Sequence, residues 1–137
     1  MKWQFHDGGR KLAGYRPHAR DCVIRSISIA LNLDYKRTAK RIAKGLNWDD
    51  AHWSQGMHSG KYRNFLFKKG WMYISLTGER CDTDNAEDRL PKTQLILQMH
   101  RHLVACYKHI LYDTWDSRTI RGKKKYPNTI LGYWQKI

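Results

Sequence analysis

The chain has 137 residues, of which 41% are hydrophobic and 12% aromatic, so it has the length of one domain and enough apolar surface for a core. This composition excludes an intrinsically disordered chain, and we expect a single domain over residues 1–137. The formal net charge of +14, from 26 Lys and Arg against 12 Asp and Glu, favours an anionic partner. Three cysteines at unrelated spacings exclude a disulfide framework.

The N-terminal residues MKWQFHDGGRKLAGY contain no continuous apolar segment of the kind that a signal peptide needs. No later apolar run is long enough to cross a bilayer as a helix. We therefore expect a cytoplasmic protein without membrane contact, whose cysteines are free thiols in a reducing compartment. The sequence indicates no particular oligomeric state.

The first predicted helix lies within residues 20–32, RDCVIRSISIALN, and begins near Cys22. Its apolar residues recur at helical spacing and leave little polar surface, which predicts a central, buried helix. These apolar residues are Val23, Ile24, Ile27, Ile29, Ala30 and Leu31.

A second predicted helix begins after the N-cap residue Asp34 and is amphipathic, with one apolar and one strongly basic side. A third is predicted over residues 61–69, with Ser59 near its N-cap and Gly70 at its end, before the strand-like segment WMYISL. The second helix has an apolar stripe of Tyr35, Ala39, Ile42, Ala43 and Leu46, and a basic side of Lys36, Arg37, Lys40, Arg41 and Lys44.

Four β-rich segments follow Pro91, namely QLILQM, HLVACY, ILYDTW and TILGYW. The acidic stretch GERCDTDNAEDRLP before them is typical of a surface loop. Helices therefore precede strands along the chain. This order predicts an α+β domain in which a C-terminal antiparallel sheet packs against the helix that Cys22 begins.

Cys22 at a helix N-terminus is a candidate nucleophile. The macrodipole and the unpaired N–H groups of a first helical turn favour a thiolate, and the N–H groups of Cys22 and Val23 are candidate donors to an oxyanion. Asp21 would raise the pKa of the thiol if its carboxylate pointed at the sulfur. Arg25, four residues further on, is placed to hold that carboxylate away.

A nucleophilic cysteine needs a base and a group that orients the base. If Lys108-His109 is a two-residue turn between HLVACY and ILYDTW, Tyr107 pairs with Ile110. The same register places His102 and Asp113 as diagonal neighbours on one face of the sheet, within hydrogen-bond reach. Asp116 would fall on the other face, so this geometry favours Asp113 as the orienting residue.

The order of these residues resembles the papain-like superfamily, including bacteriocin-processing cysteine peptidases: Cys22 begins a buried helix, HLVA follows on a strand and YDTWD on the next. KWQFHDGGR, DCVIRSISIA, RHLVACYKHILYDTWDS and the terminal GYW also resemble a family of small bacterial and bacteriophage proteins, over most of the chain. The resemblance implies a papain-like fold, with Cys22 as nucleophile, His102 as base and Asp113 as orienting acid. It also implies a bacterial or phage-infected host cell.

Two positions depart from these patterns. The papain pattern has a glutamine six residues before the nucleophile, where this chain has Arg16. Gln4 is the only glutamine upstream of Cys22, so the side chain of Gln4 and the N–H of Val23 are the candidate oxyanion donors. The related small proteins carry Gly in the hairpin turn, whereas Lys108-His109 does not match the usual turn residues.

Other readings remain open. His100, His102 and Cys106 share one strand parity and are possible zinc ligands, but no fourth ligand is specified, and we expect no metal or cofactor. Cys81 and Cys106 are expected to be structural. The basic side of the second helix, together with Lys123, Lys124 and Lys125, offers patches for nucleic acid or another anion, although no nucleic-acid motif accompanies the charge.

We therefore predict a papain-like cysteine hydrolase, a peptidase or isopeptidase, that cleaves an amide bond of a protein or peptide with Cys22, His102 and Asp113. The alternative is a non-catalytic basic protein on the same fold that binds host protein or nucleic acid.

Overall fold

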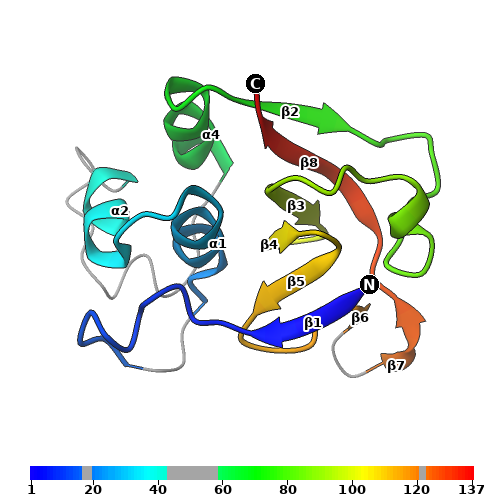
Figure 1. Cartoon of the computed structure of the whole chain (residues 1–137), viewed down its shortest axis with the longest axis horizontal. Helices are drawn as coiled ribbons and strands as arrows, with labels where there is room; N and C mark the ends of the chain where they lie inside the picture. The colour runs from blue at the N-terminus through cyan, green and yellow to red at the C-terminus, as the bar shows by residue number, and fades with distance from the viewer. Residues whose placement is uncertain (17–19, 43–58, 121–122) are drawn as a thin grey trace.

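A computed structural model describes residues 1–16, 20–42, 59–120 and 123–137 (Figure 1). Helices and strands both contribute to the described part of the chain, and the mixed α+β class predicted from the sequence is confirmed. In chain order the elements are β1 (Lys2–Phe5), α1 (Cys22–Leu31), α2 (Tyr35–Ile42), α4 (Ser59–Lys68), β2 (Trp71–Ser75), the short 3₁₀ helix η1 (Ala86–Asp88), β3 (Leu95–Met99), β4 (His102–Tyr107), β5 (Ile110–Asp113), β6 (Thr119–Ile120), β7 (Lys123–Pro127) and β8 (Ile130–Lys136).

Six strands form one sheet in the order β1-β5-β4-β3-β8-β2, and β6 pairs with β7 separately. Neighbouring strands of the large sheet are antiparallel except β1 and β5, which run parallel. The C-terminal strands pair antiparallel, as predicted, but the N-terminal strand β1, which was not predicted, makes the sheet mixed. In β1 only Trp3 is half-buried and the other residues are exposed, so this strand lacks the alternation that identifies a strand in a sequence.

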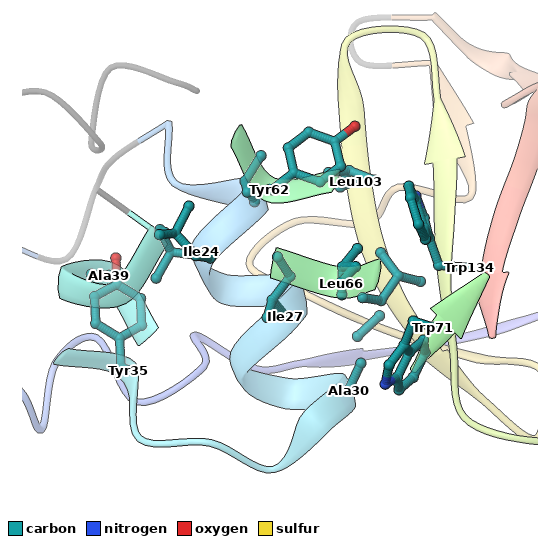
Figure 2. Packing of buried hydrophobic residues seen from close by; sticks show 14 residues of the cluster. Ile24, Ile27, Ala30, Tyr35, Ala39, Tyr62, Leu66, Trp71, Leu103 and Trp134 are labelled. Carbon is teal, nitrogen blue, oxygen red and sulfur yellow. The ribbon is translucent and has the colours of Figure 1, made fainter. Parts of the chain in front are cut away.

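One face of the sheet carries the helices (Figure 1). Ile27 of α1 and Leu66 of α4 are fully buried on this side of the sheet, and Ile24 of α1 is fully buried beside Ala39 of α2 (Figure 2). Trp134 of β8 is also fully buried, with its ring 5.3 Å from that of Tyr73. Helix α1 contacts α2 on one side and β4 on the other, so the predicted central position of this helix is confirmed.

The opposite face of the sheet is covered by the acidic segment. Cys81, Ala86 and Leu90 from this segment are buried in a second apolar cluster with residues of β3, β4 and β5. Asp82 organises the turn, because its Oδ1 accepts hydrogen bonds from the backbone N–H groups of Asp84 and Asn85 at 2.9 and 3.2 Å. The prediction of a simple surface loop is thus wrong, because the charged residues of this segment alternate with apolar anchors.

The β4–β5 hairpin has the register predicted from the sequence, with Tyr107 opposite Ile110. Lys108 and His109 adopt φ angles of 48° and 63°, the left-handed values that a two-residue type I′ turn requires. The turn contains no glycine, and tertiary hydrogen bonds stabilise the positive φ angles of these two residues instead. The N–H of Lys108 donates to the carbonyl of Lys92 at 3.2 Å, and Nε2 of the buried His109 lies 3.0 Å from the carbonyl of Leu90.

None of the helices in the described part of the chain is long and apolar enough to span a membrane.

Candidate active site

Cys22 is the first residue of α1 and is half-buried. The helix starts here because Asp21 takes the N-cap position, where its carbonyl accepts the N–H of Arg25 at 2.9 Å. The N–H groups of Cys22 and Val23 precede that first bond and have no acceptor within the helix. The sulfur therefore lies beside the positive end of a ten-residue helix, as predicted.

His102 and Asp113 lie at the same end of the β4–β5 hairpin, as the first and last residues of their strands. Nε2 of His102 donates to Oδ2 of Asp113 at 2.6 Å, so the predicted contact between them is confirmed. Asp113 is fully buried, and its Oδ1 accepts the N–H of Thr114 at 2.8 Å. The ring of Trp115 lies 5.0 Å from the His102 ring, at a tilted angle.

Cys22 and His102 lie close enough across the gap between α1 and β4 for each to shift the pKa of the other. Because Nε2 of His102 faces Asp113, Nδ1 is the nitrogen left for the thiol. The backbone N–H of Leu103, next to His102, also lowers the pKa of the thiol. The nucleophile, base and orienting acid predicted from the sequence are thus in contact in the order Cys22, His102, Asp113.

The electrostatics of this cluster favour a thiolate and an imidazolium. Burial alone would raise the pKa of the Cys22 thiol, but the hydrogen bond and positive charge of His102, the Leu103 N–H and the charge of Arg25 together lower it. Burial would lower the pKa of His102, yet Asp113 and Cys22 raise it to about 9. For Asp113 the opposing effect of burial is again outweighed by His102 and Arg25, which lower its pKa.

The Asp21 carboxylate is bound by other side chains, and Arg25 is one of them, as proposed from the sequence. Its Oδ1 pairs with Nη1 of Arg25, and its Oδ2 accepts the hydroxyl of Tyr35 at 2.7 Å. Nη2 of the same arginine donates to Oδ1 of Asp113 at 2.8 Å. The preference for Asp113 over Asp116 also agrees with the structure, since Asp116 is paired with Arg118 at 2.7 Å.

The two candidate oxyanion donors differ in their positions. Val23 is buried in the first turn of α1 beside the nucleophile. Gln4 is exposed on β1, where it pairs with Tyr112 of β5. No hydrogen bond joins the side chain of Gln4 to Cys22 among the described residues. The backbone at the start of α1 is therefore the better placed of the two, and the role of Gln4 stays a prediction.

A polar pair beside the site was missed from the sequence. The hydroxyl of Tyr62 on α4 donates to Oε1 of Gln98 on β3 at 3.0 Å, and Gln98 lies opposite Leu103 in the sheet. Cys22 raises the pKa of Tyr62, in addition to the larger effect of burial, so this hydroxyl senses the charge of the thiolate. Only the interruption of the apolar run LILQM by Gln98, at the same strand parity as Ile96, could have indicated a polar residue on the helix-covered face.

The remaining thiols and the possible zinc ligands lie apart from this arrangement. Cys81 and Cys106 are fully buried in the second apolar cluster, and burial raises the pKa of Cys106 to about 12. His100 is exposed in the β3–β4 turn, while His102 is committed to Asp113. Within the described residues, no three His, Cys, Asp or Glu side chains are grouped to hold a metal ion.

The predicted anion patches are described only in part. Lys36, Arg37, Lys40 and Arg41 are exposed on α2, opposite its buried Tyr35 and Ile42. Lys44 lies outside the described residues, and for Lys123, Lys124 and Lys125 of β7 the side chains do as well.

A scan against protein-family models, a search of curated proteins and a search of solved structures each found no match.

Proposed function

We propose that the chain is a papain-like cysteine hydrolase, a peptidase or isopeptidase, that cleaves an amide bond of a protein or peptide. The observation that carries this proposal is the contact series from Cys22 through His102 to Asp113, with the sulfur at the start of a buried helix. Further support comes from the shifts that favour a thiolate beside an imidazolium.

In the proposed reaction the Cys22 thiolate attacks the carbonyl carbon of the scissile amide, and the carbonyl electrons move onto oxygen. N–H groups at the start of α1 stabilise this oxyanion. The imidazolium of His102 gives its proton to the leaving amine as the tetrahedral intermediate collapses to a thioester. His102 then takes a proton from water, which attacks the thioester and releases the acid, while Asp113 holds the imidazole in place.

Alkylation by iodoacetamide at pH 7 tests the activated thiol directly. We expect Cys22 to be modified at least ten-fold faster than Cys81 or Cys106. The pKa of the Cys22 thiol is lowered, whereas burial raises the pKa of each of the other two thiols. A His102→Ala variant should lose this advantage. Equal, slow modification of all three thiols in the native protein would contradict the proposal.

Turnover needs a substrate assay, because alkylation reports the thiol alone. A mixture of peptides exposed to the protein and analysed by mass spectrometry should yield cleavage products that disappear in Cys22→Ser. Products that persist in this variant would come from another activity. By its resemblance we place the protein in the cytoplasm of a bacterial or phage-infected cell.

A second candidate function is binding of nucleic acid or another polyanion without catalysis. The observation that favours it is α2, where four exposed cations share one side and none forms an ion pair within the described ranges. Binding of this kind weakens steeply as salt rises. The test measures retention on a labelled nucleic acid between 50 and 200 mM salt, a range over which four phosphate contacts would lose about 10²-fold in affinity. Charge reversal at Lys36 and Lys40 should abolish retention.

A further inference from the structure

Arg25 lies at the centre of a buried polar network that extends beyond Cys22 and His102. Its side chain is buried, Nη2 donates to Oδ1 of Asp113 at 2.8 Å, and Nη1 pairs with Oδ1 of Asp21. A Cβ added at Gly8, where φ is +72°, would lie 3.1 Å from both Cα and Cγ of Arg25. The N-terminal turn thus closes directly over this arginine.

The network continues from Asp21 toward α2. The hydroxyl of Tyr35 donates to Oδ2 of Asp21 at 2.7 Å, and Nη1 of Arg10 donates to the Tyr35 oxygen at 2.9 Å. Asp21, Tyr35 and Arg10 are each only 2% exposed. Both carboxylate oxygens of the residue that directly precedes Cys22 are therefore occupied by donors from other parts of the chain.

We propose that Arg25 is a positioning residue that sets the protonation of the Cys22–His102 pair, by holding Asp113 against His102 and by turning Asp21 away from the sulfur. This inference rests on the proposed function. A guanidinium suits the task because its two terminal nitrogens can each donate to a different carboxylate. A lysine ammonium has a single nitrogen and cannot bridge two carboxylates in the same geometry.

The Asp21 carboxylate and the Arg25 guanidinium act on the thiol in opposite directions. The charge of Arg25 favours a thiolate at Cys22, whereas the carboxylate of Asp21, the residue directly before Cys22, disfavours one. Removing the Asp21 carboxylate or the Arg25 cation should therefore move the thiol pKa in opposite senses. The charged and titratable groups around Arg25 are Asp21 before α1, Cys22 on α1, Tyr35 on α2, His102 on β4, Asp113 on β5, and Arg10 through the Tyr35 hydroxyl.

The experiment measures the rate at which iodoacetamide modifies Cys22 against pH, with the modified residue assigned by mass spectrometry. In Arg25→Gln the midpoint of the acidic limb should rise by roughly one pH unit, the size of shift that a neighbouring charge produces. In Asp21→Asn, which keeps the shape of the side chain, the midpoint should fall by a similar amount. A merely structural role would not produce shifts of opposite sign.

Arg25→Lys separates charge from geometry. It should keep the midpoint near that of the wild type but lower the plateau rate several-fold, because an ammonium cannot bridge both carboxylates in the same way. Arg89→Gln is the matched control for net charge, since Arg89 pairs with Glu79 in the segment on the other face of the sheet. This control should leave the profile unchanged.

Each result bears on one proposal or the other. Shifts of the same sign in Arg25→Gln and Asp21→Asn, or no shift in either, would overturn the inference while a reactive wild-type thiol leaves the proposed function standing. A wild-type thiol no faster than Cys81 would instead overturn the proposed function. If Arg25→Gln fails to fold, two other variants decide the question: the midpoint should fall in Asp21→Asn and rise slightly in Tyr35→Phe, which removes a donor that holds the Asp21 carboxylate.

Discussion

His102 and Asp113 are eleven positions apart in the sequence, yet Nε2 of the histidine lies 2.6 Å from Oδ2 of the aspartate. One hairpin achieves this, because His102 begins β4 and Asp113 ends β5. The aspartate is fully buried, so its interaction with the histidine is little screened by water. The protonation of His102 therefore depends strongly on a residue whose position is fixed by strand register.

Asp113→Asn should weaken the site without changing its shape. The amide can still accept a hydrogen bond from His102, but it no longer supplies the negative charge that helps raise the pKa of the histidine to about 9. The alkaline midpoint of the pH profile of Cys22 alkylation, at which His102 loses its proton, should move down toward pH 6.5, the ordinary pKa of histidine. A ¹H–¹⁵N NMR titration of His102 measures the same shift independently. An unchanged His102 pKa would show that Asp113 has no electrostatic role.

The raised pKa of His102 also predicts how stability depends on pH. Its folded value of about 9 lies above the ordinary value of 6.5, so the folded state binds the proton more tightly than the unfolded state. The resulting stabilisation is complete below pH 6.5 and is lost as pH rises to about 9. Across this window the free energy of unfolding should fall by at most about 1.4 kcal/mol per pH unit.

Urea unfolding of the wild type and of His102→Gln at pH 6 and pH 9.5 measures this loss. The wild type should lose more stability between the two pH values than the variant does. Cys22 contributes in the opposite sense, because its lowered pKa gives stability that is present above pH 9 and lost as pH falls. Cys22→Ser serves as the background in which the contribution of His102 is isolated. Parallel losses in both proteins would contradict the assignment.

Periodicity was sufficient to predict the elements that pack against one another. Strands β3 and β4 bury nearly continuous apolar runs, and α1 buries apolar residues at helical spacing, so hydrophobic patterning indicated them directly. The same patterning failed for β1, which is held in the sheet mainly by backbone pairing to β5 while most of its side chains face solvent. A strand stabilised in this way leaves little trace in a single sequence.

The site could be predicted where chemistry and register coincided. The sequence pattern placed Cys22 at the start of a helix, and the two-residue turn of the β4–β5 hairpin brought His102 next to Asp113. The Tyr62–Gln98 pair could not be predicted, because it depends on how α4 lies against β3, which no local pattern specifies. Arg25 was identified as a partner of Asp21, but its second bond, to Asp113, spans 88 positions of sequence.

Ile27→Ala should destabilise the domain substantially, because Ile27 is fully buried between α1 and the sheet (Figure 2). Truncations of this kind cost about 2–5 kcal/mol in the free energy of unfolding. Ile29→Ala, on the same helix but only half-buried, is the matched control and should cost less. Urea denaturation of both variants gives the comparison, and equal costs would contradict the packing of α1 described above.

Lys108→Gly tests the turn that fixes the register of the site. Lys108 has a φ of 48°, which costs a residue with a side chain roughly 1–2 kcal/mol and costs glycine nothing. Two effects offset part of the stabilisation that relief of this strain gives. Glycine increases the conformational entropy of the unfolded chain, and the substitution removes the Lys108 ammonium, which lies 5.3 Å from the Tyr107 ring centroid. We therefore expect a small net gain, below about 1 kcal/mol in the free energy of unfolding.

Lys108→Val, whose branched side chain opposes positive φ, should destabilise the hairpin instead. It should also reduce the alkylation rate of Cys22, because the turn positions His102 and Asp113. A loss of stability in the glycine variant and none in the valine variant would contradict the type I′ turn.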